Sequence, residues 1–259
     1  MFSGGIGSWA TAKRVVERHG PDDVQLLFTD TLIEDEDLYR FLPEAAENVG
    51  AELVWIKEGR DPWQVFFDKR FLGNHRVDSC SSVLKREMSR KWIEANCDPA
   101  DTVLYLGIDW TEEHRFLRAV PHWKPYTLEA PLIQPPLLDK NQQIQWARSE
   151  GLEPCRLYGM GFPHANCGGF CIKAGHAMFK LLLEKMPERY AYHEQREQEF
   201  REFIGKDVAM MVDRVGGGPR RPLTMKALRE RVQQDRCETL DLFEWGGCAC
   251  FTPDEYNEA

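Results

Sequence analysis

A glycine-rich run near the N-terminus has the residue types and spacing to bind an anion. Ser3-Gly4-Gly5-Ile6-Gly7-Ser8 precedes a segment rich in helix formers. Glycines let backbone amides approach an anion closely, and the N-terminus of the following helix adds donors and a favourable dipole. The run therefore predicts a phosphate-binding loop, in which Ser3 and Ser8 add hydroxyl groups. Taken alone, it could equally be a glycine-rich helix cap, because it matches neither the phosphate loop nor the dinucleotide-binding glycine pattern.

Cysteine is the second residue type that could do chemistry. The chain has eight cysteines in 259 residues and no recognisable export signal at its start. We therefore expect metal ligands, reactive thiols or buried small side chains, and not a disulfide scaffold. Their spacing matters more than their number.

The composition limits the partners of the protein. Lys and Arg number 33 against 42 Asp and Glu, which gives a net charge of −9. Coating nucleic acid by bulk electrostatics needs a surplus of cations, so that class is excluded, whereas a local basic groove is not. No run approaches the roughly 18 apolar residues that a membrane helix needs. We expect a cytoplasmic protein with no membrane contact.

Hydrophobic periodicity predicts alternating helices and strands in the first half of the chain. Short β-rich runs between amphipathic helices are typical of an α/β fold with a largely parallel sheet. The expected helices cover residues 9–19, 38–49 and 85–95, and the expected strands cover 24–28, 52–56 and 102–108.

Prolines interrupt the chain from Pro131 onward. The expected elements are a helix over 141–150, a Gly/Cys-rich loop over 157–169, helices over 172–185 and 187–204, a hinge over 216–222 and a helix over 224–234. We therefore expect a nucleotide-binding α/β domain over residues 1–135. A Cys-rich loop and helical C-terminal region over 136–259 should pack on it as one unit.

Three segments carry a resemblance to a known superfamily. The glycine-rich run resembles the Ser-Gly-Gly-x-x-Ser pyrophosphate loop of the PP-loop ATP alpha-hydrolases. Phe28-Thr29-Asp30-Thr31 looks like their second nucleotide element, and Leu106-Gly107-Ile108-Asp109-Trp110 with Glu112 and Arg115 resembles a segment of their phosphoadenosine phosphosulfate (PAPS) reductase branch. The resemblance implies a Rossmann-like (HUP-type) parallel sheet flanked by helices, and the binding of ATP with Mg²⁺. The implied nucleotide-binding residues are Ser3, Gly4, Gly5, Ile6, Gly7, Ser8, Phe28, Asp30 and Gly107.

The start of the chain departs from this superfamily. Its members carry a buried strand directly before the loop, whereas here Met1 and Phe2 precede Ser3. Either this strand is very short or the chain lacks upstream residues of the natural protein. A gap in the centre of a sheet would leave neighbouring backbone groups unpaired.

The cysteine segments resemble iron-sulfur reductases of the same branch. Cys80 lies in a segment similar to their Cys-Cys-x-x-x-Lys motif, with Ser81 in place of the second cysteine and Lys85 at the lysine. Residues 151–162 resemble their Pro-Leu-Tyr-x-x-Gly-Tyr segment, and the Cys-x-x-x-Cys at 167–171 resembles their downstream Cys-x-x-Cys. The resemblance implies that a 4Fe-4S cluster is held by Cys80, Cys155, Cys167 and Cys171. Soft thiolates also suit zinc, and a site without metal is the third alternative.

The remaining cysteines leave further alternatives open. Cys248 or Cys250 could replace Cys155 as a ligand, form a redox-active pair, or simply pack. If only three cysteines ligate, one iron would be open to sulfide or substrate, as resemblance to iron-sulfur tRNA-thiolating enzymes suggests. Cys97 and Cys237 are expected to be structural or incidental.

The resemblance implies a family of reactions more firmly than one reaction. The leading hypothesis is adenylation of an acceptor by ATP with release of pyrophosphate, followed by sulfur transfer. Ser3, Ser8, Lys85 and Arg115 are the expected catalytic residues. The acceptor could be a nucleotide, a nucleic acid or a small metabolite, with a thiol or other sulfur donor as a partner and a homodimer as an open alternative. The rival hypotheses are a PAPS or adenylylsulfate reductase, whose Glu-Cys-Gly-x-His-like tail is not present here, and a non-catalytic nucleotide- or cluster-sensing module.

Overall fold

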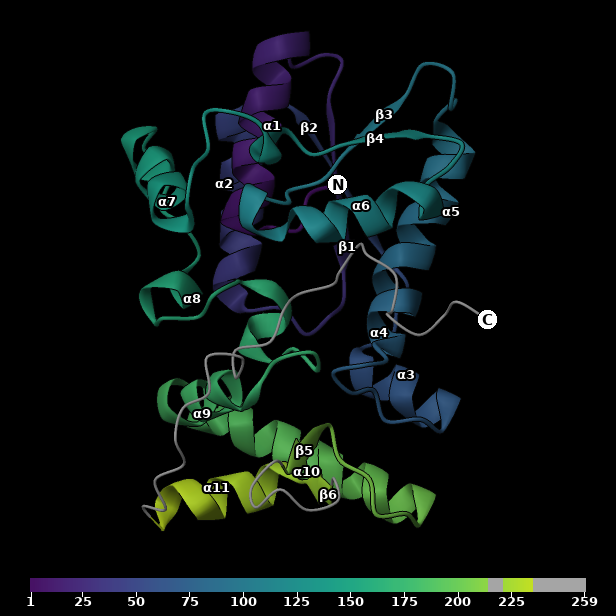
Figure 1. The fold of residues 1–259 in the computed structure, drawn as a ribbon, viewed down its shortest axis with the longest axis vertical. Coiled ribbons are helices and arrows are strands. Elements are labelled where there is room, and N and C mark those ends of the chain that lie inside the picture. Colours follow the sequence, from purple (N-terminus) through teal and green to yellow (C-terminus); the bar gives the residue numbers. More distant parts are fainter. Residues whose placement is uncertain (214–220, 235–259) are drawn as a thin grey trace.

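Helices alternate with short parallel strands in the first half of the computed structural model, which describes residues 1–213 and 221–234 (Figure 1). The elements are α1 (Ile6–His19), β1 (Gln25–Asp30), α2 (Glu36–Val49), β2 (Glu52–Lys57), α3 (Pro62–Lys69), α4 (Ser79–Ser81), the π-helix η1 (Ser82–Glu87), α5 (Met88–Asn96), β3 (Val103–Tyr105), the 3-10 helix η2 (Trp110–Glu112), α6 (Glu113–His122) and β4 (Thr127–Glu129). The mixed α/β class with parallel strand pairs is therefore confirmed.

Helices dominate the second half. Its elements are η3 (Pro131–Ile133), α7 (Lys140–Ser149), α8 (Arg156–Gly159), η4 (Asn166–Gly169), α9 (His176–Lys185), α10 (Pro187–Ile204), β5 (Met211–Asp213), β6 (Arg221–Leu223) and α11 (Met225–Gln233). The loop predicted over 157–169 thus contains two short helical turns. The predicted hinge lies mostly outside the described residues, and its last two positions belong to β6, which pairs antiparallel with β5. No helix in the described part of the chain is both long and apolar enough to cross a membrane.

Capping residues set several helix boundaries. Asp35 caps the start of α2, because its carboxylate accepts a hydrogen bond from the backbone amide of Asp37. Gly50 ends that helix in the left-handed conformation. A capping box between Asp139 and Gln142 begins α7. These signals are local in sequence, so the helices predicted in both places are confirmed to within two residues.

The N-terminus lies between the two parallel strand pairs (Figure 1). β1 pairs with β2 along all six residues of each strand, and β3 pairs with β4 over three. The amide of Phe2 donates to the carbonyl of Leu27 at 2.8 Å, and the nitrogen of Met1 donates to the carbonyl of Tyr105 at 2.8 Å. Met1 and Phe2 therefore connect β1 to β3 through one hydrogen bond to each strand.

The strand predicted over 102–108 is shorter than expected. Only Val103–Tyr105 pairs in register with β4, because the chain then turns to bring Gly107 against the glycine-rich run. The helix predicted over 85–95 also differs, since helical structure begins earlier, at Ser79, and passes through η1. The described strands form three two-stranded sheets, so no continuous parallel sheet is seen among them.

Two hydrophobic clusters hold these elements together. The larger one joins α1 and α2 to α3, the cysteine-containing segments and α9 to α11, with Trp9, Trp63 and Tyr190 fully buried. The smaller one lies around β3 and β4 and includes Ile93 and Trp123. Because the larger cluster takes residues from both sides of position 135, the cysteine-containing region shares a core with the N-terminal half.

Candidate functional site

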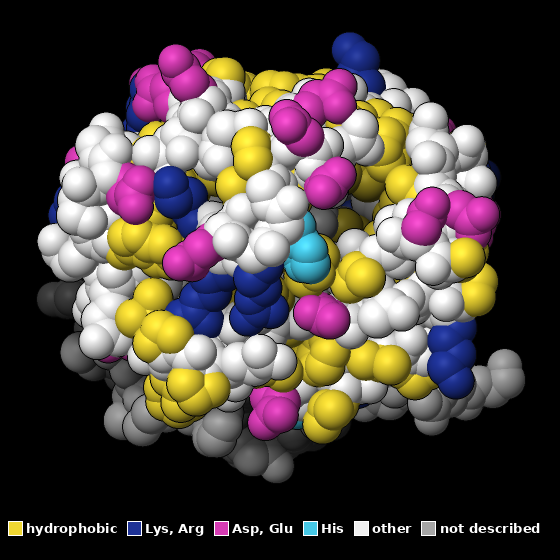
Figure 2. Space-filling model, turned by 90° about the horizontal axis from the view of Figure 1, so that it is seen from above, with side chains coloured by type: hydrophobic (Ala, Val, Ile, Leu, Met, Phe, Trp, Pro, Cys, Tyr) yellow, Lys and Arg dark blue, Asp and Glu magenta, His cyan; other side chains and the backbone are white. Residues whose placement is uncertain are grey.

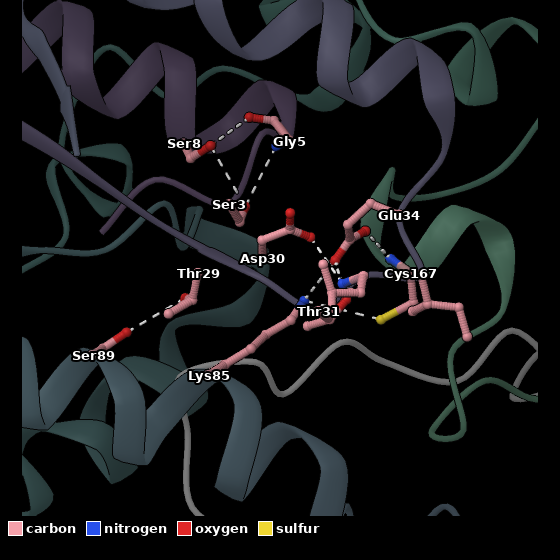
Figure 3. A network of polar contacts seen from close by, with 12 residues as sticks. Ser3, Gly5, Ser8, Thr29, Asp30, Thr31, Glu34, Lys85, Ser89 and Cys167 are labelled. Carbon is pink, nitrogen blue, oxygen red and sulfur yellow. Dashed lines mark hydrogen bonds and ion pairs between the residues drawn. The ribbon is translucent and has the colours of Figure 1, made fainter. Parts of the chain in front are cut away.

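The glycine-rich run forms the turn that leads into α1. Gly4 has a φ of +74°, and a Cβ there would lie 2.7 Å from Leu38, so both the backbone conformation and the space require glycine. Ser8 Oγ donates to the carbonyl of Gly5 at 2.7 Å, and Ser3 Oγ accepts from the amide of Gly5 at 3.4 Å (Figure 3). The two hydroxyl groups predicted to bind phosphate lie 3.5 Å apart on this turn.

The loop after β3 packs directly on this turn. A Cβ added to Gly107 would lie 2.7 Å from the nitrogen of Ser8, and a Cβ added to Gly7 would lie 3.1 Å from the carbonyl oxygen of Gly107. The two backbones approach so closely that Gly107 has no room for a side chain. The structure therefore brings together Gly7, Ser8 and Gly107, which were predicted to bind the nucleotide.

Hydrogen-bond donors gather at the start of α1. The amide of Ile6 donates to the hydroxyl of Tyr158, a residue of α8, at 2.9 Å. Among the described residues, the amide of Gly7 contacts no acceptor. An anion at this position would meet that amide, nearby hydroxyl groups and the positive end of the helix dipole. The turn can therefore bind a phosphate group.

Asp30 ends β1 beside this turn (Figure 3). Its carboxylate accepts hydrogen bonds from the Tyr39 hydroxyl at 2.9 Å, from Trp55 Nε1 at 3.2 Å and from the amide of Leu32 at 2.8 Å. These donors make Asp30 a group that orients the aromatic pair of Tyr39 and Trp55. Phe28 is 1% exposed and packs edge-on against Trp55, which leaves only its backbone for a nucleotide.

A buried ion pair links this strand end to the cysteine loop (Figure 3). Lys85 Nζ lies 3.3 Å from Glu34 Oε1, and both side chains are at most 5% exposed. Glu34 also accepts hydrogen bonds from the Thr31 hydroxyl at 2.9 Å and from the backbone amide of Cys167. Lys85 Nζ lies 3.9 Å from Cys167 Sγ. The lysine thus places a cation beside a thiol that was predicted to bind metal.

Three of the four predicted ligands meet at this place. Cys80, Cys167 and Cys171 line one small cavity of about 10 Å³ together with Phe170. Burial raises the pKa of the Cys80 thiol to about 12, and burial likewise raises the pKa of Cys167 well above its usual value. Both thiols are therefore protonated at neutral pH unless a metal ion or a nearer cation stabilises the thiolate.

The fourth predicted ligand lies elsewhere. Cys155 directly precedes α8, and it is not among the described residues that line the cavity of the other three cysteines. Burial raises its pKa to about 12, and its charged neighbours are Asp35, Asp37 and Arg40. Within residues 1–213 and 221–234, no group of three His, Cys, Asp or Glu side chains has an arrangement that could hold a metal ion. The alternative ligands Cys248 and Cys250 lie outside the described residues.

Arg115, the remaining predicted catalytic residue, lies on α6. Its guanidinium pairs with the carboxylate of Glu112, three residues earlier.

Sequence reasoning missed three contributors to the site. Glu34 joins Lys85 to the cysteine loop, Tyr158 caps α1, and Trp55, which is 41% exposed, stacks on Tyr39. Glu34 lies four residues after Asp30, in a segment rich in acidic residues, which was the only local signal. The other two depend on contacts that no local pattern predicts.

Comparison with known proteins adds no assignment, since no family model and no curated sequence matches the chain.

Proposed function

We propose that the protein binds ATP with Mg²⁺ at the glycine-rich turn and adenylates an acceptor with release of pyrophosphate. The observation that supports the proposal is the close packing of Gly107 on Gly7 and Ser8 at the glycine-rich turn that begins α1. Open α/β folds bind ligands at the carboxyl ends of parallel strands, and the ends of β1 and β3 both lie at this turn. Figure 3 shows the end of β1 between this turn and the cysteine loop.

The chemistry is an in-line displacement at phosphorus. An acceptor oxygen attacks the alpha phosphorus, the bond to the bridging oxygen of the beta phosphate breaks, and pyrophosphate leaves. The amides of the turn and the hydroxyls of Ser3 and Ser8 stabilise the charge that develops on the phosphate oxygens, and a bound Mg²⁺ would offset part of the same charge. A sulfur nucleophile from the thiol region then attacks the activated acceptor carbon, the carbon–oxygen bond breaks, and AMP leaves with that oxygen.

We propose that Cys80, Cys167 and Cys171, which line one cavity but are not arranged as metal ligands in the described part of the chain, would come closer together to hold an iron-sulfur cluster. Thiolates suit a 4Fe-4S cluster. Cys155 does not line the cavity, so in this proposal another ligand takes the fourth position or the cluster has three thiolate ligands. A cluster held by three thiolates would supply one open iron that binds sulfide or substrate. Lys85 would balance the negative charge of such a site, and Glu34 would hold the lysine in place. Zinc is the alternative metal.

The remaining proposals follow from the same resemblance. We propose that the two parallel strand pairs are parts of one Rossmann-like (HUP-type) sheet, and that the protein acts in the cytoplasm. Residues 1–135 would form the nucleotide-binding part, and the cysteine-containing remainder would carry the sulfur chemistry. The acceptor is a nucleotide, a nucleic acid bound locally, or a small metabolite.

Product analysis tests this function. Incubation with ATP, Mg²⁺ and candidate acceptors should yield AMP and pyrophosphate. Ser8→Ala should lower the rate of AMP formation, because the Ser8 hydroxyl hydrogen-bonds to the carbonyl of Gly5 within the turn. Gly159→Ala is the matched control, since an added Cβ there meets no atom within 4 Å. Formation of ADP and phosphate would refute the adenylation mechanism. Release of sulfite from PAPS or adenylylsulfate with thioredoxin would favour the reductase instead, and nucleotide binding without turnover would favour a sensor.

A further inference from the structure

A pocket of about 360 Å³ lies far from the glycine-rich turn, where the ends of α3 and α10 meet β5 and β6. Figure 1 shows α3, α10 and this strand pair together at the lower end of the molecule, whereas α1 lies at the upper end. The lining comes from three segments: the loop after α3, the end of α10 with the loop after it, and the β5–β6 pair. The pocket shares no lining residue with the thiol cavity, and the proposed reaction does not use it.

The floor of this pocket is apolar. Leu72 and Met211 are 5% and 4% exposed, and the half-buried side chains of Ile204, Val208 and Val212 adjoin them. Small-molecule sites in proteins combine such an apolar lining with a few polar groups, and their volumes begin at about 300 Å³. The pocket therefore has the size and the surface to hold a small molecule with a hydrocarbon body.

The rim of the pocket is positively charged. Arg70, Lys206 and Arg221 are exposed, and each comes from a different one of the three lining segments. Within residues 1–213 and 221–234, none of them pairs with a carboxylate. Asp207, the acidic residue of the described lining, already pairs with Arg201 at 2.8 Å. The rim thus carries positive charge that an anion from solution can neutralise.

Many other arginines of this acidic protein have a carboxylate beside them. The net charge is −9, and Arg40 pairs with Glu44 and Arg229 with Glu194. Figure 2 shows the upper face of the molecule, where the basic side chains at the centre have acidic side chains next to them. The rim of the pocket differs from these places, because its guanidinium groups keep their hydrogen-bond donors for a ligand.

The backbone at Arg70 is an independent indication of function. Arg70 ends α3 with a φ of +50°, in the left-handed conformation that glycine or asparagine ordinarily takes at this position. A larger side chain strains the backbone there, and such strain gathers at sites that bind ligands. The guanidinium lies 5.1 Å from the ring centre of Phe203, at the end of α10. A ligand for this cation explains why an arginine stands where glycine would be less strained.

We propose that the pocket binds a small amphipathic carboxylate. Its hydrocarbon body lies on the apolar floor, and its carboxylate contacts Arg70, Lys206 and Arg221. Guanidinium groups match the two oxygens of a carboxylate, and removal of apolar carbon from water adds affinity in proportion to the area buried. The proposal is independent of nucleotide binding, because it uses none of the residues of that site.

The test uses octanoate as the probe and the whole chain. Its dissociation constant is measured by saturation-transfer NMR, and 1-octanol and acetate serve as probes that keep only the apolar body or only the carboxylate. Octanoate should bind with a dissociation constant below about 1 mM, and the other two should bind at least about tenfold more weakly. Amide hydrogen exchange should slow in residues 70–74 and 204–212 when octanoate is present.

Three variants assign the binding to the pocket. Arg70→Gly removes the cation but suits the left-handed conformation, so the thermal midpoint should stay at or above that of the wild type. The affinity for octanoate should fall about threefold to tenfold in this variant, and by a similar factor in Lys206→Gln. Lys69→Gln is the matched control, since it removes a cation next to Arg70 that does not line the pocket.

Several results would overturn the proposal. One is that octanoate does not bind, or that octanol or acetate binds as tightly. Another is that Arg70→Gly and Lys206→Gln keep the wild-type affinity, or that Lys69→Gln weakens binding as much as they do, which would make net charge alone responsible. Protection from exchange only outside the lining segments would place the probe elsewhere and refute the assignment of the site.

Discussion

Gly107→Ala tests the contact on which the nucleotide site depends. The new Cβ would lie 2.7 Å from the nitrogen of Ser8, 2.8 Å from its Cα and 2.9 Å from the carbonyl carbon of Gly7. The shortest distance is about 0.7 Å inside the 3.4 Å at which ordinary contact begins, and the atoms it meets are backbone, which cannot rotate away. Since Gly107 does not have a positive φ, alanine brings no backbone strain of its own. The glycine-rich turn must therefore move.

The size of the effect follows from that displacement. Overpacking of this kind costs about 1–3 kcal/mol, which lowers the thermal midpoint of a chain of this size by about 2–12 °C. A displacement approaching 1 Å in groups that position a phosphate should lower turnover by about tenfold to a hundredfold. Thermal unfolding and AMP formation measure the two effects, with Gly159→Ala as the control that should change neither. If Gly107→Ala keeps the wild-type midpoint and rate, the two loops do not pack as described and the site argument fails.

Three further predictions concern the buried charges and thiols. Lys85→Met should lower the free energy of unfolding by about 3–5 kcal/mol, because the Glu34 carboxylate loses its buried partner. An unchanged denaturant concentration at the midpoint of chemical unfolding would contradict this. Burial raises the pKa of Glu197 from 4.5 to about 7, so protonated Glu197 stabilises the fold fully below pH 4.5. This stability, about 3 kcal/mol, is lost as the pH rises to 7. Glu197→Gln should flatten the profile of thermal midpoint against pH, and equal slopes for both proteins would exclude this role. After anaerobic reconstitution with iron and sulfide, Cys80→Ser should lose the visible absorbance and bound iron while Cys155→Ser keeps both, and the reverse order, or a colourless zinc protein, would refute the assignment of ligands.

Local signals explain which elements were predictable. The helix predicted over 187–204 has the bounds of α10, because Pro187 suits the first turn of a helix and Gly205 ends it in the left-handed conformation. The strand predicted over 52–56 is confirmed to within one residue for the same kind of reason, since Gly50 separates it from α2. β3 was predicted too long because its end is set by the approach of Gly107 to a loop distant in sequence.

The candidate site divides in a similar way. The glycine-rich run was identified from a pattern of a few residues with its own chemistry. Asp30 and Lys85 were identified through the resemblance of their segments to a known superfamily. Glu34 was missed because an acidic residue in an acidic segment is ordinarily a solvated side chain, and only its burial beside Lys85 distinguishes it. The grouping of Cys155 with the other ligands followed from residue type and resemblance, neither of which measures distance.

The sequence by itself determined that a glycine-rich turn opens the first helix, that helices and parallel strands alternate, and that the chain carries enough thiols for a metal site. These properties depend on backbone freedom, periodicity and side-chain chemistry, which are local. Only the tertiary structure decided that Cys80, Cys167 and Cys171 share one cavity that Cys155 does not line, and that the ends of α3 and α10 form a pocket with β5 and β6. Those results depend on how distant segments pack, because burial and hydrogen bonding between strands are properties of the whole fold.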